Sequence, residues 1–147
     1  MVVNDAVRVY LTRTLIWPML GMPAVTGVLV RVPACADELV LHQVQYVVTA
    51  DRAVTADIYF RDTDPPTWAD YSHNPYQFSP KMQARLGPGQ PWIHDVMLAD
   101  PDHWAMVTAT SGLAPETADF HCTLAVDGVV ADTSSGARGA LCSIRLW

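Results

Sequence analysis

The sequence has 147 residues, of which 50% are hydrophobic and 16% are charged, and its formal net charge is −6. This length allows one domain of ordinary size, and the acidic balance argues against a nucleic-acid partner, because phosphate binding requires a basic surface. Residues 1–31 carry three arginines and one aspartate, a net charge of +2, whereas residues 32–147 carry six basic and fourteen acidic side chains, a net charge of −8. A basic head joined to an acidic body is typical of a membrane-anchored protein whose N-terminus faces the cytoplasm.

An uncharged run of seventeen residues, 14–30, lies between Arg13 and Arg31. As a helix this run has a length of roughly 25 Å, near the lower limit for crossing a bilayer. It predicts a single transmembrane helix within residues 1–38, with residues 39–147 on the periplasmic side of the inner membrane. Small residues at Gly21, Ala24 and Gly27 would let a neighbouring membrane helix approach closely, so we expect them to contact a partner.

Two other interpretations of the same segment stay open. Residues 32–35 read Val-Pro-Ala-Cys, a partial lipobox, which fits a cleaved secretory or lipoprotein signal. The run also fits a buried helix of a soluble domain. Cys35 is odd by count, so we expect it to be unpaired or to face lipid near the exit of the helix.

From residue 39 onward the hydrophobic pattern has a period of two, which is typical of strands. The sequence predicts a mainly β domain over residues 39–147, an immunoglobulin-like antiparallel β-sandwich. The Asp127-Gly128 pair predicts a tight hairpin, because a type I′ turn needs positive φ at both central residues. The expected strands are 39–48, 54–60, 92–98, 103–110, 120–126, 129–132 and 141–146, with a Gly/Ser-rich loop before the last one.

A segment rich in proline and aromatic residues, at about 63–89, interrupts the strand pattern. Proline prevents ladder pairing, so this segment is expected to be a long loop or insertion. Its aromatic side chains either fold back on the domain's own core, or contact another protein or lipid headgroups, or recognise a ligand. The candidate contact residues are Trp68, Tyr71, Tyr76 and Phe78.

Cys122 lies in one expected strand and Cys142 in the last one. Neighbouring strands or facing sheets would bring them within disulfide distance. Such a bond persists only in an oxidising compartment, which agrees with the topology inferred from charge. Two free buried cysteines remain the alternative.

No catalytic constellation is visible in the sequence, and we expect neither a cofactor nor an enzymatic activity. His42, His94 and His121 fall within expected strands and would form a metal site only if their faces matched. The Asp100-Pro101-Asp102-His103 run reads as an acidic turn before a strand and lacks the ligand spacing of a calcium loop.

The order of several short motifs resembles the MmpS family of actinobacterial membrane proteins. The matching pieces are a Trp-Pro pair at 17–18, a Val-x-Tyr-x-Val strand at 44–48, an Ala-Asp-Ile-x-Tyr-like strand at 56–60, Pro91-Trp92, a Cys-x-Leu-x-Val-Asp-Gly hairpin at 122–128 and the late Cys142. The resemblance implies one membrane helix followed by a small extracytoplasmic β-sandwich. Two features depart from that family, namely a short linker between the helix and the first strand, and the insertion at 63–89.

The short linker would hold the domain tightly against the membrane, which suits a permanently bound subunit. Small accessory subunits with one helix and an external β domain occur in the cytochrome bcc/cytochrome c oxidase supercomplex of actinobacteria, and this sequence is similar to such a subunit. By this analogy we expect a non-catalytic accessory subunit, partnered by integral membrane subunits and the lipid bilayer. The first alternative is an accessory protein of an MmpL exporter of lipids or siderophores. The second is an anchored domain that binds a small molecule or a metal.

Overall fold

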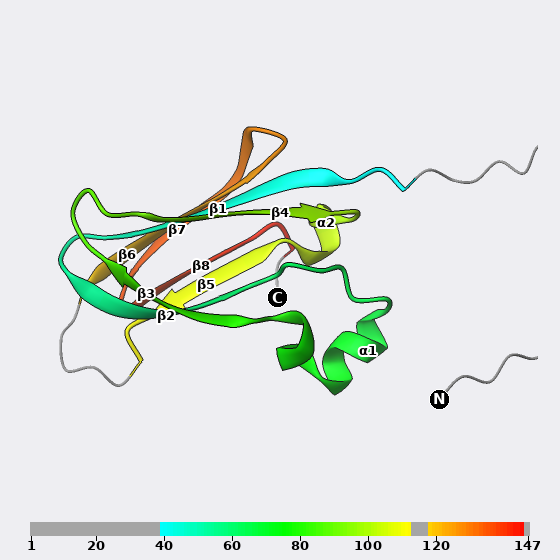
Figure 1. The fold of residues 1–147 in the computed structure, drawn as a ribbon, viewed down its shortest axis with the longest axis horizontal. Coiled ribbons are helices and arrows are strands. Elements are labelled where there is room, and N and C mark those ends of the chain that lie inside the picture. Colours follow the sequence, from blue (N-terminus) through cyan, green and yellow to red (C-terminus); the bar gives the residue numbers. More distant parts are fainter. Residues whose placement is uncertain (1–38, 113–117, 146–147) are drawn as a thin grey trace, which may run out of the picture. The chain divides into compact units, whose positions relative to one another are not determined.

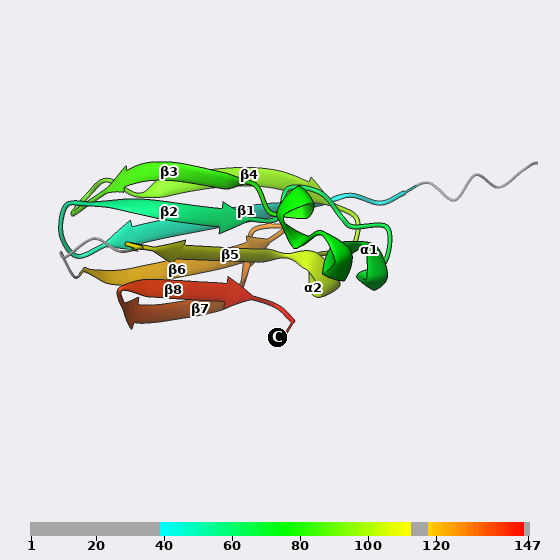
Figure 2. The ribbon, with the colours of Figure 1, turned by 90° about the horizontal axis from the view of Figure 1, so that it is seen from below.

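The computed structural model describes residues 39–112 and 118–145 of the chain. Eight strands form two four-stranded antiparallel sheets, with orders β4-β1-β6-β7 and β3-β2-β5-β8, which pack face to face (Figures 1 and 2). The prediction of a mainly β sandwich is therefore confirmed.

In chain order the elements are β1 (His42–Ala50), β2 (Val54–Phe60), α1 (Trp68–His73), the 3-10 helix η1 (Pro75–Phe78), β3 (Lys81–Leu86), β4 (Trp92–Leu98), α2 (Pro101–Trp104), β5 (Met106–Thr110), β6 (Asp119–Val126), β7 (Val129–Ala137) and β8 (Gly139–Ser143).

The core lies between the two sheets, where alternate residues of each strand point inward. In β1 the inward residues Val44, Tyr46 and Val48 are fully buried, and the residues between them are exposed or half-buried. This alternation is the period of two that a half-solvated sheet requires. The buried Tyr46 hydroxyl donates a hydrogen bond of 2.8 Å to the carbonyl of Arg61, so its polar end is satisfied inside the core.

A disulfide joins the two sheets. Cys122 in β6 and Cys142 in β8 are both fully buried, and their Cα atoms are 6.0 Å apart. The pairing expected from the sequence is present, and it connects facing sheets rather than neighbouring strands.

The hairpin between β6 and β7 turns at the expected pair. Asp127 has φ of 49° and Gly128 has φ of 80°, as a type I′ turn demands. Its position is fixed on β1, because the backbone N–H of Asp127 donates to the carbonyl of Gln43 at 2.8 Å.

Three expectations about local structure were wrong. The insertion at 63–89 is not a loop throughout, because β3 (Lys81–Leu86) pairs with β2 along its length. The prolines of this segment flank β3 and leave its ladder intact. Likewise, the Gly/Ser-rich stretch is no loop, because β7 continues to Ala137 and pairs with β6 as far as Asp119. The chain then reverses at a single residue, Arg138, with φ of 77°.

The third error concerns the strand expected over 103–110, which begins only at Met106. The residues before it form α2, because the Asp100 side chain caps the backbone N–H of His103 and Pro101 occupies the first turn. As a result Trp104 lies in a short helix at the end of the sandwich and not in a sheet.

Candidate functional site

The insertion between β2 and β3 lies at the same end of the sandwich as α2, the helix between β4 and β5 (Figures 1 and 2). Asp64 connects the two segments, because its carboxylate accepts the backbone N–H groups of Ala99 at 2.7 Å and Asp100 at 3.0 Å. The insertion is thus attached to the sandwich by charge-assisted hydrogen bonds at its beginning.

Arg61, the first residue after β2, is fully buried and holds the other end of the insertion. Its Nη1 donates to the carbonyl of Phe78 and to the hydroxyl of Ser79, both at 2.8 Å, and its Nε donates to the carbonyl of Trp104 at 3.3 Å. No ion pair between described residues includes Arg61. Its charge is instead stabilised by carbonyl groups and by aromatic faces.

Aromatic rings from α1 and α2 stack beside Arg61. The guanidinium carbon of Arg61 lies 4.3 Å from the centre of the Tyr71 ring and 5.8 Å from that of Trp104. Trp68 stacks on Trp104, with 6.0 Å between ring centres and an interplanar angle of 20°. The guanidinium of Arg145 covers Trp68 at 4.4 Å. We call these five side chains the aromatic–arginine cluster.

The four aromatic residues expected to contact a partner differ in their exposure. Trp68 and Tyr76 remain 46% and 76% exposed, whereas Tyr71 and Phe78 are half-buried. Trp68 and Tyr71 pack on α2, at the end of the sandwich and outside its main core. The structure therefore brings Trp68 and Tyr71 together and presents Tyr76 to solvent on η1.

A hollow of about 590 Å³ lies on the insertion, between α1 and η1. Polar side chains line much of it, including Asp70, His73, Asn74 and Gln77. Asp70 is already engaged, since its carboxylate accepts the Thr67 hydroxyl at 2.7 Å as part of the cap of α1. Such a wall offers hydrogen-bonding groups but little enclosed apolar surface for a small molecule.

The three strand histidines do not converge. His42 bonds Asp127 at 2.7 Å, His94 packs on Phe60 with 4.5 Å between ring centres, and His121 bonds Ser135 at 2.7 Å on the opposite face of its sheet. Within the part of the chain that the structure describes, no group of three or more histidine, cysteine or carboxylate side chains is arranged to hold a metal ion. These three histidines therefore do not form a metal site. His42 and His94 lie on one face of their sheet, and His121 lies on the other face.

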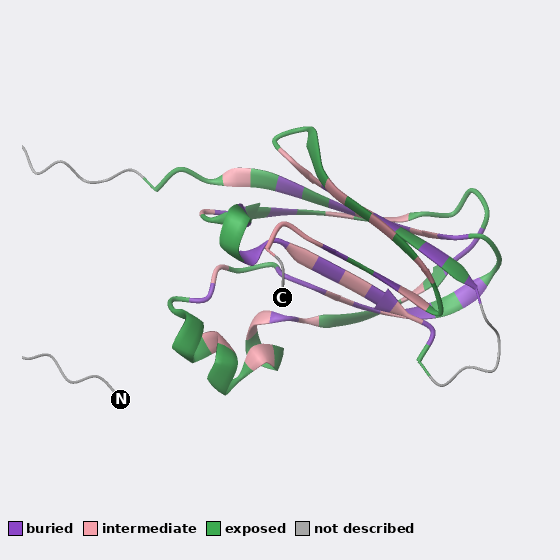
Figure 3. Cartoon of the chain, turned by 180° about the vertical axis from the view of Figure 1, so that it is seen from behind, coloured by how far each residue is buried: buried purple, intermediate pink, exposed green. Residues whose placement is uncertain are grey.

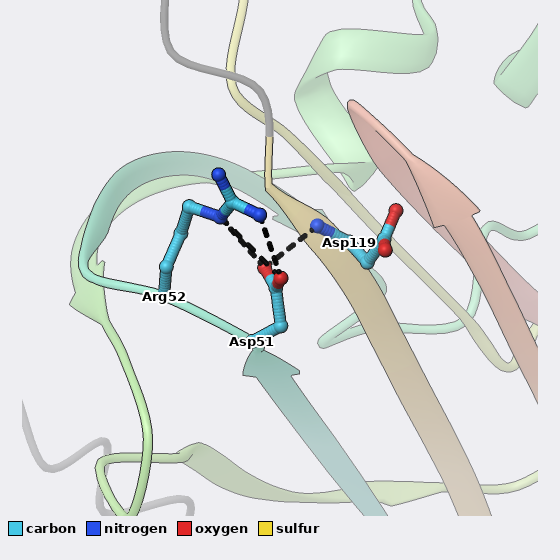
Figure 4. A network of polar contacts seen from close by, with 3 residues as sticks. All are labelled: Asp51, Arg52 and Asp119. Atoms are coloured by element: carbon cyan, nitrogen blue, oxygen red, sulfur yellow. Dashed lines mark hydrogen bonds and ion pairs between the residues drawn. The ribbon is translucent and has the colours of Figure 1, made fainter.

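Two exposed ion pairs lie on the sandwich itself, outside the aromatic–arginine cluster. On the outer face of the β2–β3 pair, Lys81 lies 2.9 Å from Asp57, and this hydrogen bond lowers the pKa of the Asp57 carboxyl. At the opposite end of the sandwich, Asp51 accepts hydrogen bonds from Arg52 and from the backbone N–H of Asp119 (Figure 4). The Arg52 side chain, and then the Asp119 N–H, hold the pKa of Asp51 below its usual value. This second network fastens the β1–β2 turn to the start of β6.

Sequence reasoning missed three members of the cluster, namely Arg61, Trp104 and Arg145. Nothing in the pattern around Arg61 distinguishes a buried arginine from an exposed one, because its acceptors are backbone carbonyls distant in sequence. For Trp104 a signal existed, since Asp100-Pro101 is a helix start.

Other expectations fall on residues that the structure does not describe. These are the transmembrane helix over 14–30, its small residues Gly21, Ala24 and Gly27, and the environment of Cys35. Over residues 39–112 and 118–145, no helix has the length and apolar character needed to cross a membrane.

Comparison with known proteins places the chain in a family. The model of the Rv2576c beta-sandwich domain matches residues 46–142, a range that begins within β1 and ends at Cys142. The uncharacterized proteins Rv2576c and MT2652 of two Mycobacterium tuberculosis strains, and Mb2606c of Mycobacterium bovis, are each 36% identical over 125 residues, which is 84% of this chain and 79% of theirs. No solved structure matches the chain. The protein is thus a member of the Rv2576c β-sandwich domain family.

Proposed function

We propose that the protein is a non-catalytic accessory subunit, attached to the inner membrane by one N-terminal helix and bound to a larger integral membrane complex. In this proposal the β-sandwich lies on the periplasmic side and covers part of its partner's external face. The preferred host is the actinobacterial cytochrome bcc/cytochrome c oxidase supercomplex.

The observation that carries the proposal is the exposure of Trp68 and Tyr76 on an insertion whose backbone is fixed at several points. Arg61 binds the carbonyl of Phe78, and Asp64 binds two backbone N–H groups of the α2 turn. Large aromatic side chains presented on a rigid support lose little entropy on binding, and they are enriched among residues that dominate protein interfaces.

The disulfide and the charge distribution support the periplasmic location. The Cys122–Cys142 bond requires an oxidising environment in which to form. The net charge of +2 in residues 1–31, against −8 in the rest of the chain, favours a cytoplasmic N-terminus and an external domain. The apolar run at 14–30 supplies the proposed anchor, with Gly21, Ala24 and Gly27 facing a helix of the partner.

The alternative host is an MmpL exporter. The order of short motifs, which resembles that of MmpS proteins, supports this alternative. Both proposals involve the same kind of domain and differ in the identity of the partner. A third function, the binding of a small molecule by the anchored domain, would use the hollow beside Asp70 and His73.

Extraction of the full-length chain from its own membranes in mild detergent, followed by mass spectrometry of the co-purifying proteins, tests these proposals. Oxidase and bcc subunits at constant ratio to the chain would support the preferred host, and an MmpL protein would support the alternative. Recovery as a lone monomer would contradict both. A Tyr76→Ala variant should lower the yield of partner, whereas Arg52→Ala at the opposite end of the sandwich should not.

A further inference from the structure

Exposed aliphatic side chains gather around the point where the chain enters the sandwich. β1 begins there, β4 ends there, and the β6–β7 hairpin turns there, as the pairing of His42 with Leu98 and of Val44 with Val126 requires. Figure 3 shows the tip of this hairpin and the lead into β1 among the exposed parts of the chain. The set, which we call the apolar rim, consists of Leu39, Val40, Leu41, Met97, Val129 and Val130.

The exposure of the rim is high for side chains of this kind. Leu39 is 71% exposed, Val129 72% and Val130 58%. Single exposed aliphatic residues are ordinary on a protein surface, but a group of them marks a contact with a protein or a lipid surface.

Several polar groups near the rim have partners within the protein. Asp127, at the hairpin tip, lies 2.7 Å from the His42 ring nitrogen and accepts the backbone N–H of Gln43 at 2.9 Å. Asp95, on the neighbouring strand, accepts the side-chain amide of Gln45 at 3.0 Å. Groups that are hydrogen-bonded within the protein lose less when they leave water, so the rim can approach an apolar phase at lower cost.

The length of chain before the rim favours the bilayer as its occupant. Eight residues, 31–38, separate the apolar run from Leu39. Fully extended, they span at most about 29 Å, at about 3.6 Å for each residue. If residues 14–30 cross the membrane, the rim is the end of the sandwich closest along the chain to the lipid surface.

We propose that the apolar rim rests in the interfacial region of the phospholipid bilayer, with Val129 and Val130 at the hairpin tip inserted among the lipids. This inference rests on the anchoring part of the proposed function. It adds a second membrane contact, made by the folded domain itself, which would fix the orientation of the sandwich. With that end on the membrane, the insertion between β2 and β3 would also lie near the lipid surface, where Trp68 and Tyr76 could meet the part of a partner that emerges from the bilayer.

Photo-crosslinking in native membranes tests this directly. The photoreactive amino acid p-benzoylphenylalanine replaces Val130 in the full-length chain, and in a matched variant it replaces Gln90, which lies in the β3–β4 turn at the opposite end of the sandwich. After irradiation, mass spectrometry of the peptide carrying the probe distinguishes phospholipid adducts from protein adducts. We expect several-fold more phospholipid adduct at position 130 than at position 90.

A protein adduct as the main product at position 130 would overturn the proposal and indicate that a partner or a second copy covers the rim. Equal lipid labelling at positions 130 and 90 would also overturn it. A variant with the probe at Val129 repeats the test if the first one fails to accumulate. Retention of the chain after an alkaline carbonate wash is measured separately, so loss of the anchor and failure of the rim to touch lipid are distinguished.

Discussion

The guanidinium of Arg61, directly after β2, lies 4.3 Å from the centre of the Tyr71 ring in α1 of the insertion. The same side chain binds the carbonyls of Phe78 and Trp104, so one residue at the end of β2 gathers α1, η1 and α2. The helix α1 has no buried residue of its own. The contacts with Arg61 explain how this short helix is held in a defined position at the end of the sandwich.

Replacement of Arg61 should therefore loosen the insertion. We predict that Arg61→Ala lowers the free energy of unfolding by about 2–4 kcal/mol, because it leaves buried carbonyl acceptors unpaired and opens a cavity. Denaturant unfolding measures this loss, and amide hydrogen exchange should show the largest increase over residues 62–80. Arg85→Ala, an exposed arginine on β3, is the control and should change stability little. Equal effects of the two substitutions would contradict the role given to Arg61.

The disulfide between the sheets should contribute a large part of the stability. Closing a loop of 20 residues is worth roughly 3 kcal/mol in the chain-entropy model. We predict that the double variant Cys122→Ala with Cys142→Ala loses at least about this amount, because the buried sulfur atoms are removed as well. Urea unfolding of the variant, and of the reduced wild-type protein, measures it. A reduced protein as stable as the oxidised one would show that the bond has no such role.

Tyr76 should matter for binding and not for folding. Its ring is 76% exposed, so Tyr76→Ala should change the melting temperature little. If the ring is buried in an interface with a partner, the same substitution should weaken the binding free energy by about 2 kcal/mol or more. Co-purification of the partner, quantified beside the melting temperature, separates the two effects. A Tyr76→Ala variant that retains its partner at the wild-type ratio would remove Tyr76 from the interface.

The Asp57–Lys81 pair predicts a dependence of stability on pH. The folded-state pKa of Asp57 is lowered, first by its hydrogen bond to Lys81 and then by that to Gln83, so its stabilising effect is present above the unfolded pKa, about 3.9, and is lost as the pH falls through the folded value. The pKa of Lys81 is raised by the same partner, so its effect is complete below its unfolded pKa, about 10.4, and is lost as the pH rises through the folded value.

Asp57→Asn should therefore lower the melting temperature between about pH 5 and 9, and the difference from wild type should shrink toward pH 2. Thermal unfolding across this range measures it. Asp102→Asn is a suitable control, because Asp102 is exposed and has no side-chain hydrogen bond in the described part of the chain. A difference between Asp57→Asn and wild type that persists undiminished at pH 2 would rule out this linkage.

Gly136 allows β7 and the start of β8 to lie close together. A Cβ atom at this position would lie 2.4 Å from the carbonyl oxygen of Gly139, a backbone atom that cannot move without disturbing the β5–β8 ladder. We predict that Gly136→Ala lowers the unfolding free energy by about 2 kcal/mol or more. Gly87→Ala, whose nearest contact would be an ordinary 3.4 Å, should have a much smaller effect in the same denaturation experiment.

The sequence predicted those parts of the fold that depend on local rules. The Asp127-Gly128 hairpin follows from turn chemistry, and β1, β2 and β6 follow from alternation of apolar residues, whereas β4 follows from its β-branched and aromatic residues. The strand β3 was missed although its sequence, KMQARL, alternates polar and apolar residues. Prolines stand close by on both sides, and it has no β-branched or aromatic residue, so the segment read as part of a loop.

The candidate site was predicted only in part. Trp68 and Tyr71 were identified as aromatic residues in an insertion, but their packing on Trp104 and Arg61 depends on contacts between segments far apart in sequence. Composition alone does not reveal whether an arginine is buried, since its acceptors are carbonyl groups common to every residue. The distinction between Tyr76, which is exposed, and Phe78, which is half-buried, likewise arises from the 3-10 geometry of η1 and its attachment to Arg61.

The central claim, that the insertion contacts an integral membrane partner, is tested most directly by a photoreactive residue at Tyr76 in the full-length chain within native membranes. The account predicts a single main adduct at position 76, with a membrane subunit of the oxidase or bcc complex identified by mass spectrometry, and none when the probe replaces Arg52. The absence of any protein adduct at position 76, in membranes that retain the chain, would contradict it.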